Sequence, residues 1–530
     1  MGAGTITRRE LFRQSGGLGG LLTAPVLLGA GAAGGAPAVA DELPDVYGAI
    51  GVRPLVNARG TYTIISGSVM LPEVRAAIDA AAREYVHLDE LAEAIGARLA
   101  TLTGAEWGLV SSGCAAGLTH ATAACVAGGN PDLHVRIPNL GGFPRDEVII
   151  PTHSRNVYDA AVRAVGVRVL EVSTRAELEA AIGPRTAMIY LLAGPRADES
   201  PIDLAAIASG AGPRGVPILV DAAAEILTVP NVHLQRGATL VAYSGGKCLR
   251  GPQTAGLVLG RKDLVRAAWV HSAPHHGFAR GMKVGKEEAI GMLAAVEAWV
   301  RRDHDAEWQQ WTAWLEHIAA RVAAIDGITS EIVQPEGLSN RTPSLHVRWR
   351  QEQLGTSGET VMRTLLGGEP RVALFALRGP GEPGTTGVTI TPYMLAAGEE
   401  RVVADRLHAV LTSRPKEAPV PPVAPVADLS GEWAVRIAYA AATSTHTLHL
   451  RQRDHEISGA HQGEFVTRAL SGSIDGARVR LRSVVGEEHG DSLSYTFAGN
   501  VSGDRMSGTL DMGEYLHASW TAERRASHGG

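Results

Sequence analysis

The sequence predicts a doubly wound α/β domain, then a smaller α+β domain, then an all-β domain. Between about residues 90 and 265, apolar runs such as 187–192, 217–220 and 240–243 alternate with helical patterns. Continuous apolar runs are typical of parallel strands buried on both faces of a sheet. After residue 426, short alternating runs separated by Gly and Asp turns predict about eight strands in a small up-and-down barrel or sandwich.

The chain begins with a twin-arginine pattern. Residues 7–13 contain Arg8 and Arg9, an uncharged apolar stretch follows at 16–33, and 38–40 form a small-residue cleavage site. We therefore expect residues 1–40 to be a signal peptide that directs export by the twin-arginine pathway to the periplasm or the exterior. The apolar stretch is rich in Gly and Ala and only marginally hydrophobic, so we expect no stable membrane insertion after cleavage.

Composition narrows the possible partners of this chain. The 530 residues carry a formal net charge of −6 without a basic stripe, so we expect no nucleic acid partner. Three cysteines in so long a chain do not form a disulfide framework. No Cys/His cluster has metal-ligand spacing, so we expect no metal.

A small-residue turn follows the predicted strand 106–110. Ser111, Ser112, Gly113 and Cys114 open a helix that we expect to continue through residue 127. Such a turn offers free backbone N–H groups and the positive end of the helix dipole, which suit a phosphate. A plain helix cap is the alternative. The next strand, 147–150, leads to His153, whose ring either stacks on a cofactor or has only a structural role.

An aspartate and a lysine end two consecutive apolar strands. Asp221 ends the strand 217–220, and Lys247 follows the strand 240–243 in a Ser/Gly loop that begins at Ser244. Pyridoxal 5'-phosphate chemistry needs a lysine amine that holds the cofactor as a Schiff base and a carboxylate that keeps the pyridine nitrogen protonated. Either residue alone would suggest a helix cap or a solvated lysine. Together they predict a pyridoxal phosphate site.

The segment after residue 285 has a different pattern. Helices over 286–301, 306–325 and 397–411 and strands over 344–349 and 372–377 predict a small α+β domain. An arginine in this segment could bind a substrate carboxylate. The candidates, each of which could equally be a surface charge, are Arg348, Arg371 and Arg378.

Five prolines within a short segment mark a linker to the all-β domain. The predicted divisions are residues 1–40 (signal peptide), 41–90 (N-terminal part of the small domain), 91–285 (large domain), 286–412 (small domain), 413–426 (linker) and 427–524 (barrel or sandwich). The last domain either binds an apolar or sugar ligand or a partner, or serves in packing and oligomerisation.

The lysine segment 244–256 resembles that of a known enzyme family, as do segments 56–60, 111–113, 153–156 and 282–288. Roughly residues 45–412 resemble the selenocysteine synthase-like branch of fold-type-I pyridoxal phosphate enzymes, within the aminotransferase class V-like superfamily. The resemblance implies an aminotransferase-like fold and a homodimer or larger ring of dimers. It places Gly251 and Gln253 near the phosphate of the partner subunit's cofactor, and Lys286 near the cofactor phosphate.

That branch includes selenium transferases that act on seryl-tRNA and ammonia lyases or dehydratases that act on amino sugar acids. We expect a lyase in which Lys247 removes the α-proton of a small amino acid or amino sugar acid, and elimination gives a 2-keto acid. Racemisation and transamination share this proton removal and stay open. Selenium transfer is disfavoured because no basic tRNA-binding segment is present. A binding protein that uses the C-terminal barrel is the alternative from another class.

Overall fold

The computed structural model describes residues 45–377, 383–413, 423–486 and 492–525. The predicted signal peptide and Arg378 lie outside the described residues. The described residues 45–53, which contain η1 (Gly48–Ile50), belong to one unit, and the described residues from 54 onward belong to a second. In the described ranges, no helix has both the length and the apolar character needed to cross a membrane.

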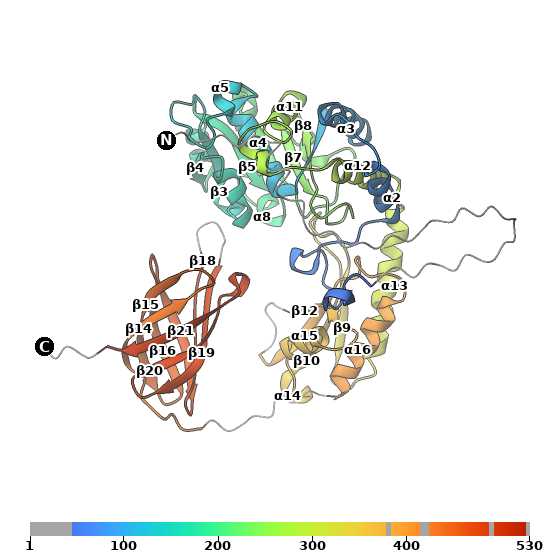
Figure 1. The fold of residues 1–530 in the computed structure, drawn as a ribbon. Coiled ribbons are helices and arrows are strands. Elements are labelled where there is room, and N and C mark those ends of the chain that lie inside the picture. Colours follow the sequence, from blue (N-terminus) through green and yellow to red (C-terminus); the bar gives the residue numbers. More distant parts are fainter. Residues whose placement is uncertain (1–44, 378–382, 414–422, 487–491, 526–530) are drawn as a thin grey trace, which may run out of the picture. The chain divides into compact units, whose positions relative to one another are not determined.

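A seven-stranded mixed sheet forms the large domain (Figure 1). Its strand order is β2-β8-β7-β6-β5-β3-β4, and β8 is antiparallel to both of its neighbours, whereas the other neighbouring pairs are parallel. The carboxyl ends of all strands except β8 therefore meet at one edge. The strands are β2 (Trp107–Ser111), β3 (Glu147–Pro151), β4 (Arg168–Val172), β5 (Thr186–Leu192), β6 (Ile218–Asp221), β7 (Leu240–Ser244) and β8 (Gly256–Gly260).

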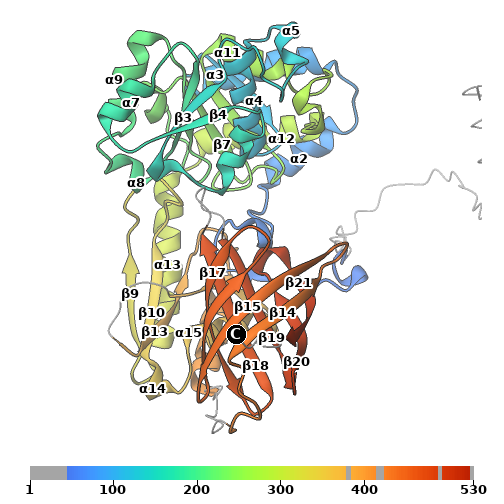
Figure 2. The ribbon, with the colours of Figure 1, turned by 90° about the vertical axis from the view of Figure 1, so that its left-hand side faces the viewer.

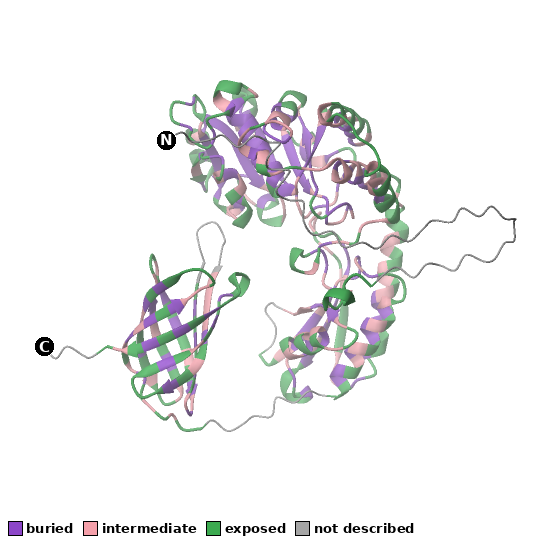
Figure 3. Cartoon of the chain, viewed as in Figure 1, coloured by how far each residue is buried: buried purple, intermediate pink, exposed green. Residues whose placement is uncertain are grey.

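Helices cover both faces of this sheet. Successive strand residues alternate between two cores: Ile149 packs in one, and Val148 and Ile150 pack in the other. Figure 3 shows the strands as the most buried part of the domain. The first core includes α3 (Leu88–Thr103), α7 (Arg175–Ala181), α9 (Leu204–Ala211) and α12 (Lys286–Arg301). The second includes α4 (Cys114–Ala127) and α11 (Lys262–Val270). The predicted α/β architecture is confirmed.

The small domain contains an antiparallel sheet of order β12-β13-β10-β9. Its strands are β9 (Thr329–Val333), β10 (Ser344–Arg350), β12 (Phe375–Ala376) and β13 (Thr385–Ile390). Residues of the sheet share a core with α13 (His304–Val322), α15 (Gly358–Gly367) and α16 (Glu399–Ser413).

The predicted strand 372–377 is wrong as a single element. The chain changes partners at buried Leu374: β11 (Val372–Ala373) pairs in parallel with β1 (Val56–Asn57), and β12 pairs with β13. An apolar run does not show which strand it pairs with. The sequence pattern therefore could not reveal that the two halves of this run pair with different strands.

The C-terminal domain is a closed barrel of sequential antiparallel strands (Figure 2). β14 pairs with β21 and closes the barrel, so the barrel, not the sandwich, is correct. Trp433, Phe497 and Trp520 fill its core. The strands are β14 (Gly431–Ala438), β15 (Thr443–Arg453), β16 (Glu456–Gln462), β17 (Thr467–Asp475), β18 (Arg478–Gly486), β19 (Ser492–Ser502), β20 (Arg505–Asp511) and β21 (His517–Arg524).

Short elements complete the described chain. They are η2 (Thr63–Ile65), α2 (Pro72–Ala81), α5 (Pro131–His134), η3 (Thr152–Ser154), η4 (Val157–Asp159), α6 (Ala160–Arg163), α8 (Pro195–Asp198), η5 (Gly212–Arg214), α10 (Val232–Gln235), η6 (Phe278–Gly281), α14 (Gln351–Leu354) and η7 (Gly513–Tyr515).

Candidate active site

Asp221 lies at the carboxyl end of β6 and is 1 % exposed. Its Oδ2 accepts a hydrogen bond of 2.9 Å from the Tyr190 hydroxyl, and its Oδ1 accepts one of 3.0 Å from the Ala223 N–H. The Cys114 thiol approaches Oδ1 at 3.7 Å. Burial raises the pKa of the Asp221 carboxyl, while these donors and the Lys247 charge act in the opposite direction. A buried carboxylate of this kind is a suitable partner for the N–H of a pyridinium ring.

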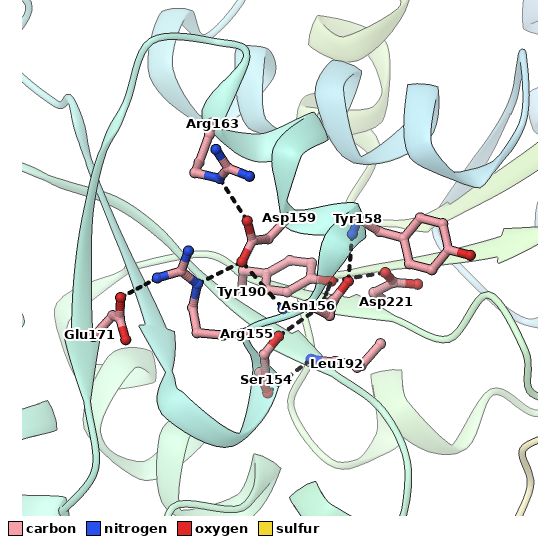
Figure 4. A network of polar contacts seen from close by, with 10 residues as sticks. All are labelled: Ser154, Arg155, Asn156, Tyr158, Asp159, Arg163, Glu171, Tyr190, Leu192 and Asp221. Carbon is pink, nitrogen blue, oxygen red and sulfur yellow. Dashed lines mark hydrogen bonds and ion pairs between the residues drawn. The ribbon is translucent and has the colours of Figure 1, made fainter. Parts of the chain in front are cut away.

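A chain of hydrogen bonds orients the Tyr190 hydroxyl (Figure 4). Asn156 Nδ2 donates to Tyr190 Oη at 3.0 Å and to the Ser154 carbonyl at 2.7 Å. Because Asn156 donates to it, the hydroxyl keeps its own proton for Asp221. The sequence analysis missed Tyr190 because, inside a continuous apolar run, it resembles an ordinary core residue.

Ion pairs of the buried Asp159 and Arg155 side chains hold the loop after β3 (Figure 4). Asp159 accepts from Arg155 at 2.6 Å and from Arg163 at 2.8 Å, and Arg155 also pairs with Glu171. This loop includes His153, which lies half-buried in η3, with its Nδ1 bonded to Ser154 Oγ at 3.1 Å. Burial lowers the pKa of His153. The imidazole ring of His153 thus lies at the same sheet edge as Asp221, and its hydrogen bond to Ser154 orients it.

The turn before α4 leaves the helix N-terminus open. Gly113 is the N-cap at φ +85°, no side chain caps the helix, and Ser111 Oγ bonds the Gly113 carbonyl at 2.8 Å instead. A Cβ on Gly113 would meet no atom within 4 Å, so open space faces this turn. Ser112 is half-buried beside it. Free N–H groups at the start of a 14-residue helix suit the phosphate of pyridoxal phosphate.

Lys247 lies half-buried in the turn between β7 and β8. Backbone hydrogen bonds close this turn, from Gly245 N–H to the Ala255 carbonyl at 2.8 Å and from Gly251 N–H to the Gly245 carbonyl at 2.9 Å. Ser244 ends β7 just before it. Burial raises the pKa of both Asp221 and Cys114, and the positive charge of Lys247 acts against this rise. Lys247, Asp221 and the turn before α4 therefore lie at the same edge of the sheet.

The neighbouring cysteines remain thiols. Burial, and then the Asp221 charge, raises the pKa of Cys114 well above its ordinary value, and burial raises that of Cys248 to about 11. Neither is therefore an activated nucleophile.

The other predicted site residues lie in the lysine turn, at the start of α12 and in the small domain. Gly251 is buried and Gln253 exposed in the lysine turn. Lys286 begins α12, where its Nζ donates to the Ala81 carbonyl at 2.8 Å and pairs with Glu287. Arg348 on β10 pairs with Glu331 at 3.2 Å, and Arg371 Nε donates to the Leu366 carbonyl at 2.9 Å.

Two further arginines line a cavity of about 560 Å³. Its lining includes Arg302, Arg341 and Cys248, the residue after Lys247. Arg302 is paired with Glu307 at 2.7 Å, whereas the exposed Arg341 lies 5.8 Å from the Trp308 ring centroid. The Asn340 N–H bonds the Ala224 carbonyl at 2.7 Å and holds this loop against the segment that follows Asp221. No sequence signal marks an arginine in such a loop.

The fold and these residues define a pyridoxal phosphate-dependent enzyme of fold type I. No family model matches the chain. The D-glucosaminate-6-phosphate ammonia lyase of Salmonella typhimurium (strain 14028s / SGSC 2262) is 30% identical over 376 residues, 69% of this chain and 98% of the relative. This chain belongs to the selenocysteine synthase-like branch of these enzymes.

Further relatives agree with this assignment. A 5'-C-glycyluridine monooxygenase-decarboxylase of a Streptomyces species is 32% identical over 342 residues, 62% of this chain and 78% of the relative. An L-seryl-tRNA(Sec) selenium transferase of Moorella thermoacetica is 26% identical over 392 residues, 67% and 73% of the two chains. A solved structure of D-glucosaminate-6-phosphate ammonia-lyase has a TM-score of 0.62 at 29% identity, covering 70% of this chain and all of that chain. The predicted family and enzyme class are confirmed.

Proposed function

We propose that this chain is an exported ammonia lyase that uses pyridoxal phosphate at Lys247 to act on an amino sugar acid or a small amino acid. The Asp221 network, with Lys247 in the adjoining turn, carries the proposal. The ammonia lyase of Salmonella typhimurium, covered over 98% of its length, supports elimination over the racemase and aminotransferase alternatives.

The residues divide the work as follows. Pyridoxal phosphate, when bound, provides a sink for negative charge at the substrate α-carbon. Asp221, which accepts hydrogen bonds from Tyr190 and Ala223, would accept a hydrogen bond from the protonated ring nitrogen. The open N-terminus of α4 binds the phosphate. The Lys247 amine would hold the cofactor and would serve as the base that removes the substrate α-proton.

The overall reaction balances without an oxidant. Loss of the α-proton and a β-hydroxyl releases water and leaves an enamine. The enamine tautomerises, and addition of one water molecule gives a 2-keto acid and ammonia. Arg341, on the cavity wall beside Cys248, is our candidate for a substrate anion, in place of Arg348 and Arg371, whose side chains are engaged elsewhere.

Location and assembly complete the proposal. The twin-arginine pattern at residues 7–13 supports export after the enzyme has folded with its cofactor. The family resemblance supports a homodimer in which Gly251 and Gln253 face the partner's cofactor. Nucleic acid is not a proposed partner, because the net charge of −6 is spread without a basic stripe.

Replacing the lysine tests the proposal directly. Lys247→Ala removes the amine that binds the cofactor, so the near-visible absorbance band, and its loss on borohydride treatment, should vanish while the circular dichroism spectrum is retained. The exposed Lys262 gives the matched control, Lys262→Ala, which should keep the band. Wild-type chain should release ammonia and a 2-keto acid from an amino sugar acid or small amino acid. A Lys247→Ala protein that still forms a reducible lysine adduct at full occupancy would show that another lysine serves.

A further inference from the structure

One end of the C-terminal barrel has a polar interior. The alternation of buried and exposed residues along the strands (Figure 3) directs five polar side chains inward, each at most 8 % exposed. Elsewhere the interior is apolar and aromatic. The five polar side chains belong to Ser444 and His446 on β15, His461 on β16, Arg468 on β17 and Ser483 on β18.

Four of these side chains form one hydrogen-bonded chain. Ser444 Oγ bonds His446 Nε2 at 3.1 Å, His446 Nδ1 bonds His461 Nε2 at 2.7 Å, and His461 Nδ1 bonds Ser483 Oγ at 2.7 Å. The Tyr439 hydroxyl joins the chain at Ser444 Oγ, at 2.8 Å. This part of the polar interior is therefore satisfied within the barrel.

Arg468 is the exception. It is 7 % exposed, and its buried Nε and Nη1 have no hydrogen-bond partner. Within the described ranges, no carboxylate forms an ion pair with it, and its close neighbour is the Tyr495 ring, whose centroid lies 4.9 Å from Cζ. A guanidinium stays charged, and burial of an unpaired charge is strongly unfavourable. Burial lowers the pKa of both histidines, that of His461 to about 3, so both are uncharged near neutral pH and do not compete with Arg468 for an anion.

A cavity of about 410 Å³ lies at this end of the barrel. Tyr439 and Tyr495 belong both to its wall and to the surroundings of the polar side chains. Most of the remaining wall is apolar or aromatic, from Leu493, Met512, Tyr515 and Leu516. A concave apolar site with few polar groups is typical of small-molecule pockets.

We propose that this end of the barrel binds a small organic anion, whose charged group pairs with Arg468 and whose apolar body occupies the cavity beside Tyr495. A carboxylate or a phosphate monoester would supply the oxygens, since a guanidinium bonds both in a bidentate manner. The proposal does not depend on the ammonia lyase activity.

Ligand-observed fluorine NMR tests it on the full chain saturated with pyridoxal phosphate. The probes are 4-fluorobenzoate, 4-fluorophenyl phosphate and neutral 4-fluorobenzyl alcohol. Wild-type protein should bind one or both anions saturably and the alcohol at least tenfold more weakly, and the preferred anion identifies the headgroup. Arg468→Met should weaken anion binding at least tenfold and keep the near-visible absorbance band. Arg480→Met, at an exposed position of β18, should bind like wild type.

The possible outcomes distinguish anion binding by the barrel from the activity of the proposed enzyme site. Absence of saturable anion binding to wild type, or binding that Arg468→Met leaves unchanged, would overturn the proposal. If Arg468→Met does not fold, Arg468→Lys retains the charge without the planar fork and should bind the preferred anion more weakly than wild type. Wild-type affinity in Arg468→Lys would also count against a guanidinium site. Loss of lyase activity in Lys247→Ala with barrel binding intact would show that the two sites are independent.

Discussion

The carboxylate of Asp221 is held by three donors, and Tyr190 is the one whose proton is directed by a further side chain, Asn156. Tyr190→Phe removes a hydrogen bond to a charged acceptor, worth about 1.5–3 kcal/mol. The pKa of Asp221 should rise, and the ring nitrogen should keep its proton less well. We expect kcat to fall roughly ten- to a hundredfold with KM and cofactor content nearly unchanged.

The matched control for this tyrosine is Tyr158→Phe. Tyr158 lies in the same loop but is 58 % exposed, and its interaction with Asn156 is through its backbone N–H. This variant should show wild-type kcat. Equal kcat values in Tyr190→Phe and wild type would remove Tyr190 from the proposed mechanism.

At the scale of single residues, the sequence identifies a site residue when a reactive side chain stands at the end of a predicted buried strand or just after it. Asp221 and Lys247 are identifiable as a pair, because Asp221 ends one buried strand and Lys247 lies in the turn that follows the next. Tyr190 and Arg468 were not identifiable. An inward-facing tyrosine in an apolar strand has the sequence pattern of core packing, and the inward direction of Arg468 depends on strand register, which the sequence does not specify uniquely.

At the scale of elements, close contact between β8 and the N-terminus of α4 positions the turn 111–114, where we propose that the cofactor phosphate binds. A Cβ on Gly256 would lie 2.4 Å from the Gly113 carbonyl carbon and 2.6 Å from the Cys114 nitrogen. Gly256→Ala should displace this turn at a cost of about 1–3 kcal/mol. We expect affinity for pyridoxal phosphate to fall roughly ten- to a hundredfold, measured by titration of the near-visible band. Gly183→Ala, with its nearest atom 4.0 Å away, should retain wild-type affinity, and equal affinities in both variants would contradict this role.

The polar interior of the barrel should make the protein less stable in acid. Burial first, then the His446 and Arg468 charges, lowers the folded-state pKa of His461 from 6.5 to about 3. Between these values the unfolded chain binds a proton that the folded barrel does not, so stability should fall as pH drops below about 6.5, by about 1 kcal/mol per pH unit. Urea midpoints at pH 7 and 5 measure this loss. It should shrink in His461→Gln and persist in His449→Gln, at an exposed position of β15; the same loss in both would exclude His461 as its source.

Strand prediction from the sequence succeeded for the central parallel strands. The runs that became β5, β6 and β7 lie in the centre of the sheet. β4, at the sheet edge and partly exposed, has a weaker apolar pattern and was not predicted. The pairing of β11 with β1 joins segments more than 300 residues apart, and nothing local in either segment specifies it.

At the scale of the whole molecule, the alignment with the ammonia lyase covers nearly all of the relative but 69% of this chain. The remainder of this chain has no counterpart there. The closed barrel pairs its strands only with one another, so no sheet of the enzyme domains depends on it for hydrogen bonding.

A chain that ends at Ser413, the last residue of α16, should therefore keep the enzyme chemistry. Asp221, Tyr190, Lys247 and the turn before α4 all precede that point, and the hydrogen bonds among them do not involve the barrel. We expect the shortened protein to retain its near-visible band and to exchange the substrate α-proton with deuterium, as followed by NMR. Anion binding at Arg468 would be absent, because the barrel is gone. If the shortened protein folds and holds pyridoxal phosphate but exchanges no α-proton, the barrel must contribute to catalysis, and the separation of the two functions would be wrong.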